Sequence, residues 1–258
     1  MLHPWSIRYE LRNRHEAKQP LQSTMPVESA QYDVVRWRSW PCEECCRRAP
    51  VLDFFSRRHE ASGALSSDAP DEIIDESRKR ERLWLPEWAA SCPHGGEVTK
   101  ELAKLSEGSE HLVYFSEDGE TVLKLTLPGI FGDSYFVADG RVNQRCCTPG
   151  DYLVRMGLLA LVFDFAPKIV GVTASGQIVT LQKFVEGDCP TQEEADEFLR
   201  ELRFEPVRQN CFLWKRAEAE DGFEYWIGDA RDENFVKTAS DIVPIDLRMW
   251  AVEIGEAE

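Results

Sequence analysis

The chain has 258 residues, of which 43% are hydrophobic and 10% aromatic, and it carries a formal net charge of −16 at pH 7. This composition argues against global disorder and allows one good core or two small lobes. The negative charge argues against direct binding to nucleic acid, because neutralising backbone phosphates needs clustered Lys and Arg. The negative charge does not argue against a nucleotide that is bound through Mg²⁺.

No stretch of the sequence approaches the roughly 18 to 20 apolar residues that a membrane-spanning helix needs. The segment 1–8 also lacks the apolar core of a signal peptide. The eight cysteines form no regular framework, which favours reduced thiols. We therefore expect a cytoplasmic protein without a membrane partner.

One group of cysteines, together with a histidine, has the ligand types of a zinc site. Thiolate and imidazole are the usual zinc ligands, but only one Cys-x-x-Cys is present, and its second half is irregular. Ordinary buried or surface thiols are the alternative interpretation. The residues concerned are Cys42, Cys45, Cys46, Cys92 and His94.

The N-terminal third of the chain shows little regular patterning. Residues 1–30 are polar and predict a tail, 32–40 alternate enough for a short strand, and 61–71 have the composition of a linker. The segment 75–85 predicts a helix with a solvated, charged face. We assign 1–83 to an N-terminal extension and linker whose function the sequence does not indicate.

Two β-hairpins are predicted in the central part of the chain. His111–Phe115 and Thr121–Thr126 flank an Asp-Gly turn, which is a strong hairpin signal. Residues 168–172 and 178–184 flank a Ser-Gly turn in the same way. The second hairpin completes a five-strand antiparallel sheet.

Two helices have clear N-terminal signatures. Thr148 followed by Pro149 predicts an N-cap and a first helical position, and apolar residues follow at helical spacing. Thr191 and Glu194 form a predicted capping box, and the apolar residues after them fall on one face of a helix. Both helices should therefore pack against a core.

Acidic residues end two short apolar runs in the C-terminal part. One run stops at Asp229 and the other at Asp246, with Asn234 on the loop between them. Mg²⁺ takes oxygen ligands, often one or two from the protein with phosphates and waters supplying the rest, and Asn234 and Asp246 can provide these. Asp229 is placed to accept the proton of an attacking hydroxyl. A purely structural role as turn and strand-end residues is the alternative.

The pattern Gly228-Asp229-x-x-x-x-Asn234, followed by Ile245-Asp246, resembles the catalytic loop and metal aspartate of the protein-kinase-like superfamily. It is most similar to the aminoglycoside-phosphotransferase and phage-type branches. Within these, the chain resembles the Ser/Thr/Tyr kinase-like domain of polyvalent proteins from phages and mobile elements.

The resemblance covers roughly Trp84 to Met249. It implies an α+β, two-lobed protein-kinase-like fold. The N-lobe, 84–186, would be built on the five-strand antiparallel sheet, and a short C-lobe would span 187–258.

The resemblance also implies roles for residues in the expected N-lobe. In kinase-like folds a loop before the second strand covers the nucleotide phosphates, and a lysine on the third strand reaches the α and β phosphates. Gly108, Ser109 and Glu110 match the loop, and Lys124 matches the catalytic lysine. Glu186 corresponds to the hinge beside the adenine.

Kinases also carry an acid on the helix behind the third strand that orients the lysine. The residue that matches it best is Asp151, although the same residue can instead be the capping-box partner of Thr148. Asp133 and Asp139 are the alternatives.

The expected function is therefore ATP- and Mg²⁺-dependent transfer of the γ-phosphoryl group to a hydroxyl acceptor, on a protein Ser, Thr or Tyr or on a small molecule. A catalytically inactive kinase-like binding or scaffold module is the alternative, because the loop has a single glycine and the C-lobe is short. A third interpretation, a small zinc-binding interaction protein, depends on the cysteine and histidine group.

Overall fold

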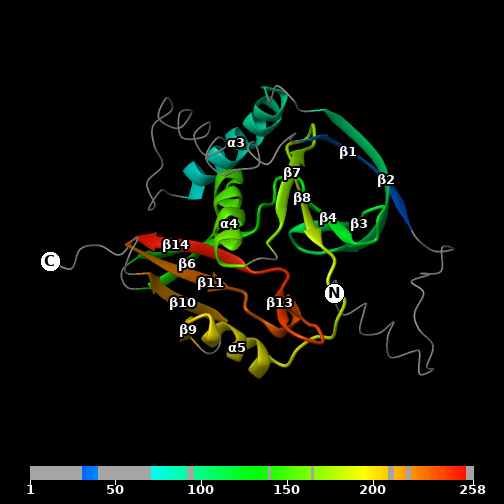
Figure 1. Cartoon of the computed structure of the whole chain (residues 1–258). Helices are drawn as coiled ribbons and strands as arrows, with labels where there is room; N and C mark the ends of the chain where they lie inside the picture. The colour runs from blue at the N-terminus through cyan, green and yellow to red at the C-terminus, as the bar shows by residue number, and fades with distance from the viewer. Residues whose placement is uncertain are drawn as a thin grey trace, which may run out of the picture.

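A computed structural model describes residues 31–39, 71–91, 96–138, 141–163, 166–208, 212–218 and 222–253. This part of the chain forms a closed six-stranded antiparallel barrel, a four-stranded sheet and three α-helices (Figure 1). None of the helices in the described ranges has the length and apolar composition that crossing a membrane requires.

The barrel has the strand order β1-β2-β3-β4-β8-β7. Its strands are β1 (Tyr32–Ser39), β2 (Glu97–Glu107), β3 (His111–Phe115), β4 (Thr121–Thr126), β7 (Lys168–Val172) and β8 (Ile178–Lys183). β1 closes the barrel, because it pairs along β2 and also meets β7 at Arg38 and Ser39. Gly171 is required at this closure, since a Cβ there would lie 2.2 Å from the Arg38 carbonyl oxygen.

The β4 strand shows how the barrel positions Lys124, a residue of the predicted site. Leu123 and Leu125 belong to a buried apolar cluster that β1, β2, β3 and β8 also supply. Because successive side chains of a strand point to opposite faces, Lys124 lies on the other face of β4. That face is turned toward helix α4 (Pro149–Val162), with which it forms the walls of a pocket.

The second part of the molecule is a sheet of order β14-β11-β10-β9. Its strands are β9 (Glu205–Arg208), β10 (Leu213–Glu218), β11 (Phe223–Gly228) and β14 (Arg248–Glu253), and the helix α5 (Gln192–Glu201) precedes them. Two hairpins accompany the sheet: β5 (Asp133–Ala138) with β6 (Arg141–Cys146), and β12 (Phe235–Lys237) with β13 (Ile242–Pro244). A 3₁₀ turn, η2 (Asp232–Asn234), leads into β12.

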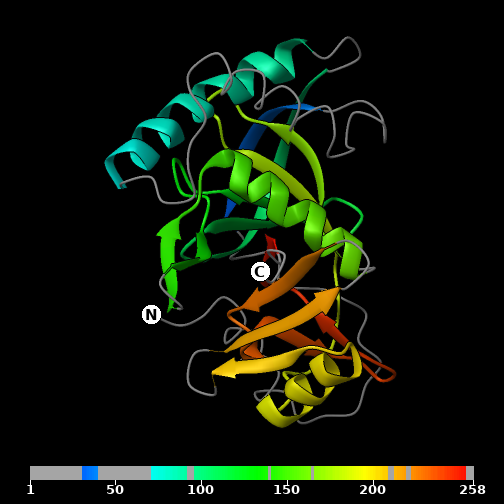
Figure 2. The same cartoon turned by 90° about the vertical axis from the view of Figure 1, so that its left-hand side faces the viewer.

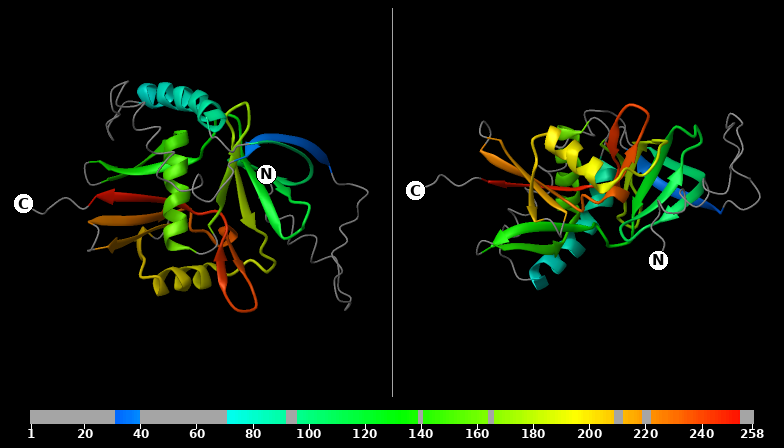
Figure 3. Two further views of the ribbon diagram at one scale, coloured as in Figure 1. Left: turned by 45° about the horizontal axis from the view of Figure 1, so that its top comes forward. Right: turned by 90° about the horizontal axis from the view of Figure 1, so that it is seen from below.

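Helix α4 lies between the barrel and the four-stranded sheet (Figure 3). Its apolar residues share one large core with α3, α5 and the sheet. Thr148 caps its N-terminus through a capping box with Asp151, and Pro149 is its first residue, as the sequence predicts. The capping box of Thr191 and Glu194 is likewise present at the start of α5.

The expected two-lobed kinase-like fold is wrong. The described chain is mostly β: the predicted five-strand sheet is a closed six-stranded barrel, and the C-terminal part is built on a β-sheet in place of a helical lobe. The predicted strand at 32–40 exists as β1, but its partners are distant in sequence. Ser39 and Gly96, 57 residues apart, are hydrogen-bonded through the Ser39 N–H and the Gly96 carbonyl at 2.7 Å. Alternation along a strand indicates that it has a buried face, but not which strand it joins.

The helix predicted at 75–85 is present within α3 (Asp71–Ser91), but it has a buried face in addition to the expected solvated one. Trp84, Leu85 and Trp88 are buried in the main core. Glu81 is buried as well, and its carboxylate accepts a hydrogen bond of 2.7 Å from the Gly150 N–H in the first turn of α4. Figure 2 shows α3 on one side of α4 and the sheet on the other. The expected boundary between residues 83 and 84 therefore falls inside a helix that belongs to the core.

Two leucines of α3 provide a test of this packing. Leu85 is fully buried, whereas Leu83 is 71% exposed. Leu85→Ala should lower the free energy of unfolding by about 2 to 5 kcal/mol, because it removes buried methyl groups and leaves a cavity. Leu83→Ala should change it by less than about 0.5 kcal/mol. Urea unfolding of both variants measures the difference, and equal values would show that α3 does not pack on the core.

Candidate functional site

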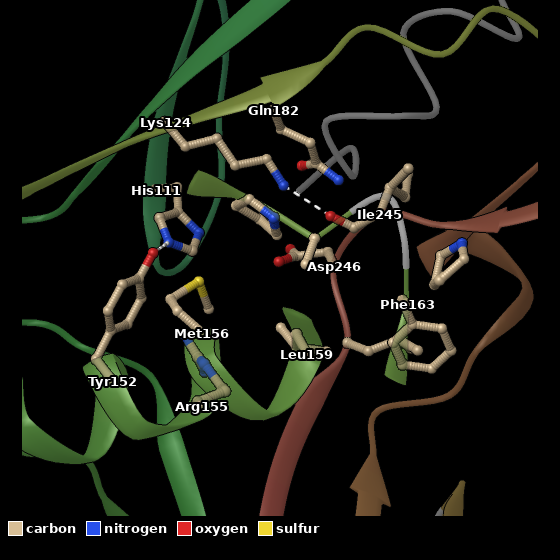
Figure 4. Close-up of a pocket in the computed structure, with 14 residues that line it drawn as sticks. His111, Lys124, Tyr152, Arg155, Met156, Leu159, Phe163, Gln182, Ile245 and Asp246 are labelled. Atoms are coloured by element: carbon tan, nitrogen blue, oxygen red, sulfur yellow. Dashed lines mark hydrogen bonds between the residues drawn. The ribbon is translucent and has the colours of Figure 1, made fainter. Parts of the chain in front are cut away.

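The candidate site is a pocket between one face of the barrel and helix α4, with the segment after β13 across it. Figure 4 shows Lys124 and Gln182 on one side of the pocket, and Tyr152, Arg155, Met156 and Leu159 of α4 on the other. Asp246 lies between these two sides, beside Ile245. Three segments far apart in sequence therefore meet at one place.

Lys124 is the cation that connects the barrel to the C-terminal segment. Its side chain is 4% exposed, and its ammonium group donates a hydrogen bond of 2.7 Å to the Ile245 carbonyl oxygen. Burial lowers the pKa of Lys124 from its ordinary value, while the carboxylates of Asp246 and Glu110 oppose that shift. The Lys124 amine and the Asp246 carboxylate therefore both belong to residues that line the pocket.

Asp246 is held in its anionic form by the cations around it. Burial by itself would raise the pKa of Asp246, but the charge of Lys124 above all, together with that of Arg155, brings that pKa below its ordinary value. A carboxylate that stays ionised in a pocket is a suitable ligand for a hard cation.

A second ion pair occupies the wall of the pocket. The Arg155 guanidinium is paired with the Glu110 carboxylate through both of its terminal nitrogens, one of them at 3.3 Å from Glu110 Oε2. Burial would raise the pKa of Glu110, but the Arg155 charge above all lowers it overall. His111 Nε2 lies 3.0 Å from the Tyr152 hydroxyl, and burial lowers the pKa of His111, so that its ring is neutral.

None of the residues of the expected phosphate loop lines this pocket, but Glu110 pairs with Arg155, which does. The Gly108 N–H donates to the His111 carbonyl oxygen at 2.9 Å, which forms a tight turn, and Ser109 is exposed. Glu110 is turned inward to Arg155. Its carboxylate therefore belongs to a buried ion pair in this structure.

The structure places the other predicted N-lobe residues away from Lys124. Asp151 engages Thr148 in the capping box, accepting from the Thr148 N–H at 2.9 Å, and lies 3.8 Å from Arg145. Asp133 forms an ion pair with Arg248, and Asp139 lies outside the described residues. Glu186 is exposed in the segment after β8 and does not line the pocket.

The loop after β11 carries the predicted nucleophile-activating residue. Asp229 has a φ of +59°, a left-handed conformation that is uncommon for a residue with a Cβ and tolerated best by Asn and Asp. Its carboxylate lies 3.0 Å from Arg231 Nε and 3.8 Å from Arg248 Nη2. Backbone strain of this kind recurs at functional sites.

Asn234 joins this loop to the pocket. Its Nδ2 donates a hydrogen bond of 2.6 Å to the Asp229 carbonyl oxygen, and its own carbonyl oxygen accepts from the Ile245 N–H at 2.9 Å. The side chain is buried, and within the described residues its Oδ1 has no hydrogen-bond partner. Asn234 therefore contacts the backbone of Asp229 and that of Ile245, the residue before Asp246.

The donor set fits Mg²⁺ held jointly with phosphate oxygens. An unpartnered amide oxygen and an ionised carboxylate are the one or two protein ligands that Mg²⁺ usually takes. No group of three or more His, Cys, Asp or Glu in the described ranges could hold a metal ion. The predicted zinc ligands Cys42, Cys45, Cys46, Cys92 and His94 all lie outside those ranges.

Sequence reasoning missed three charged or titratable residues of the site, namely His111, Arg155 and Arg248. For Arg155 a signal was present, because it lies three residues after Tyr152 and four before Leu159, on the apolar face of α4. An arginine at such a position needs a buried acid as its partner. His111 and Arg248 stand at strand ends, where their type and spacing carry no comparable signal.

Comparison of the chain with models of protein families, with curated proteins and with solved structures finds no match.

Gly132 offers a test of the Glu110–Arg155 pair. Its φ is +76°, and a Cβ there would lie 2.2 Å from Glu110 Oε2 and 2.7 Å from Arg155 Nη1. Gly222 has the same φ of +76° with no atom near its Cβ position, so Gly222→Ala reports the backbone strain alone, about 1 to 2 kcal/mol. Gly132→Ala should cost several kcal/mol more in urea unfolding, because it also displaces a buried ion pair. Similar losses in the two variants would mean that the pair tolerates a Cβ at residue 132.

The Glu110 carboxylate should also make stability depend on pH. Its pKa is below the ordinary 4.5 in the folded protein, so the unfolded chain binds more protons and the stabilising effect is lost as the pH falls below about 4.5. Glu110→Gln should lower the free energy of unfolding by about 3 to 5 kcal/mol at neutral pH, since Arg155 loses its partner. The difference from the unsubstituted protein should shrink in acid. Glu107→Gln, at an exposed carboxylate, is the control, and a pH-independent loss in Glu110→Gln would refute the assignment.

Proposed function

We propose that the chain is an ATP- and Mg²⁺-dependent phosphotransferase that moves the γ-phosphoryl group to a hydroxyl acceptor on a protein or a small molecule. The observation that carries the proposal is the position of Asn234. Its amide nitrogen holds the Asp229 loop, its backbone contacts the residue before Asp246, and its buried Oδ1 has no partner within the described residues. The motif resemblance of these residues to kinase-like catalytic loops supports the same function.

Within this proposal Asn234 and Asp246 hold the metal ion. An Mg²⁺ ion held by these two residues would supply positive charge that offsets the charge developing on the phosphates during transfer. Lys124 supplies a second positive charge for the phosphates, and its amine would exchange the Ile245 carbonyl oxygen for a phosphate oxygen. The neutral His111 and the paired Arg155 form the wall behind it.

Asp229 acts on the acceptor. Its left-handed backbone interrupts the regular course of the chain after β11, and the Asn234 side chain fixes the carbonyl of the same residue. Asp229 orients the acceptor hydroxyl and accepts its proton as the oxygen attacks phosphorus. Arg231 and Arg248 hold the carboxylate from two sides.

A second candidate function is a binding or scaffold module without catalysis. It is favoured by the contacts that Lys124 already makes within the protein. The buried Lys124 amine donates a hydrogen bond to the Ile245 carbonyl oxygen, and its charge acts on the Asp246 carboxylate. A site that is closed in this way binds a ligand only when these contacts are exchanged.

Nucleotide binding is the first test of the proposal. A ligand at about a hundred times its dissociation constant adds roughly 2.7 kcal/mol to stability, so Mg-ATP should raise the thermal midpoint clearly. Lys124→Met should weaken this shift, whereas Lys183→Met, at an exposed lysine of β8, should leave it unchanged. An unmoved midpoint at saturating Mg-ATP, while other ligands do move it, would refute the nucleotide site.

The two aspartates separate catalysis from binding. Asp246→Asn should weaken Mg-ATP binding and abolish transfer together, because the carboxylate that faces the metal is lost. Asp229→Asn should keep the Mg-ATP affinity near that of the unsubstituted protein and lower transfer by roughly 10² to 10⁴. Labelled ATP with the protein itself and with a cell extract measures transfer. Binding without transfer in the unsubstituted protein, with Asp229→Asn indistinguishable from it, would establish the scaffold function.

A further inference from the structure

The tyrosine of the β5–β6 hairpin lies beside the Asp229 loop. β5 packs against β14, and the Tyr135 ring stacks on the Trp250 ring with centroids 4.6 Å apart and an interplanar angle of 27°. Trp250 is in turn packed against Trp226 of β11. These contacts hold the Tyr135 ring in one position against the four-stranded sheet.

The ring edge of Tyr135 touches the residue that precedes Asp229. A Cβ on Gly228 would lie 2.9 Å from Tyr135 Cε2, the ring carbon next to the one that bears the hydroxyl. Glycine at residue 228 therefore allows the phenol to approach the backbone immediately before the left-handed Asp229.

Arg248 connects the β5 strand that carries Tyr135 to the Asp229 carboxylate. Its guanidinium group forms an ion pair of 2.9 Å with Asp133, two residues before Tyr135 on β5, and lies 3.8 Å from Asp229 Oδ2. Its positive charge also acts on the Tyr135 phenol, whose pKa it lowers. A guanidinium is a small, planar group with its donors in a fixed fork. The β5 strand of Tyr135 and the Asp229 carboxylate are therefore neighbours around a single cation.

The surroundings keep the Tyr135 phenol protonated. Burial raises its pKa above the ordinary 10.0, Arg248 opposes this shift, and the charges of Asp229 and Asp133 add to it. A protonated phenol needs a base before it can attack phosphorus, and Asp229 is the residue to which the proposed function assigns that role. Arg248 is also only two residues from the metal-facing Asp246, whose pKa it helps to lower.

We propose that Tyr135 is an intramolecular phosphoryl acceptor, so that the protein phosphorylates its own β5–β6 hairpin. The inference rests on the proposed phosphotransferase function and names its acceptor. The Tyr135 oxygen forms a bond to the γ-phosphorus of ATP, the bond from that phosphorus to the β,γ-bridging oxygen breaks, and ADP leaves. The phenol proton passes to the Asp229 carboxylate. Arg248 and Arg231, which already contact Asp229, can bind the new phosphate through charge-assisted hydrogen bonds.

The first experiment tests the position of the hydroxyl without any nucleotide. Phenol ionisation of Tyr135 is followed by ultraviolet absorbance, as the difference between each protein and its counterpart carrying Tyr135→Phe. In Asp229→Asn the titration should move to lower pH, because a nearby negative charge is removed. An unmoved titration would show that Tyr135 does not face Asp229 and would overturn the inference.

The second experiment follows transfer in the full chain. After incubation with Mg-ATP, intact-mass and peptide mass spectrometry should show one phosphoryl group on Tyr135, at a first-order rate that does not depend on protein concentration. Tyr135→Phe keeps the stacking ring and should lose the label, but should show the same thermal shift with Mg²⁺ and a non-hydrolysable ATP analogue. Tyr32→Phe, at a 49% exposed tyrosine of β1, is the matched control and should label normally.

The possible failures are distinguishable. Nucleotide binding with transfer to other residues or to extract proteins, while Tyr135 stays unmodified, overturns this inference and leaves the phosphotransferase in place. A labelling rate that rises with protein concentration overturns the intramolecular route. The absence of any thermal shift with the analogue overturns the proposed function itself, and the acceptor assignment with it.

Discussion

The contact of Lys124 with the segment Ile245–Asp246 is the interaction on which the rest of the site depends. It joins a barrel strand to the end of the β12–β13 hairpin across 121 residues, through a hydrogen bond of 2.7 Å from the buried ammonium group. Pleating directs Lys124 away from its apolar neighbours Leu123 and Leu125, toward α4. Without an acid and a carbonyl to meet it, an amine in that position would carry the full cost of burial.

The neighbouring pair of Glu110 and Arg155 makes the pocket wall electrically balanced. Lys124 and Arg155 supply two positive charges, Glu110 and Asp246 supply two negative ones, and burial keeps His111 neutral. Buried ion pairs often contribute little net stability compared with well-packed apolar residues, although removing one partner is costly. This cluster therefore matters for the arrangement that it specifies more than for net stability. It holds the turn before β3 against α4, and it leaves the anionic Asp246 carboxylate facing the pocket.

Strain and close packing combine at the second half of the site. Gly228 allows Tyr135 and Trp250 to approach the backbone, and Asp229 then adopts a left-handed conformation that the Asn234 amide stabilises. Asn234 Nδ2 donates this hydrogen bond, whereas the buried Asn234 Oδ1 has no partner within the described residues. Leaving a buried acceptor unsatisfied costs about 1 to 3 kcal/mol, a cost that a bound cation would offset.

The sequence by itself determined the local elements. Capping boxes, a Pro at the first helical position, and Asp-Gly and Ser-Gly turns act over three or four residues, so they located α4, α5 and the β3–β4 and β7–β8 hairpins. For the site, the two strand-ending acids Asp229 and Asp246, with Asn234 between them, gave a prediction of which residues act. The tertiary structure decided what depends on long-range pairing. It showed that β1 closes a barrel, that Glu110 binds Arg155 rather than lying open in a loop, that Asp151 serves as a cap, and that Tyr135 stacks on Trp250 beside the Asp133–Arg248 pair. Such contacts join residues tens of positions apart, and the periodicity of a strand or helix reports which face is buried but not against what.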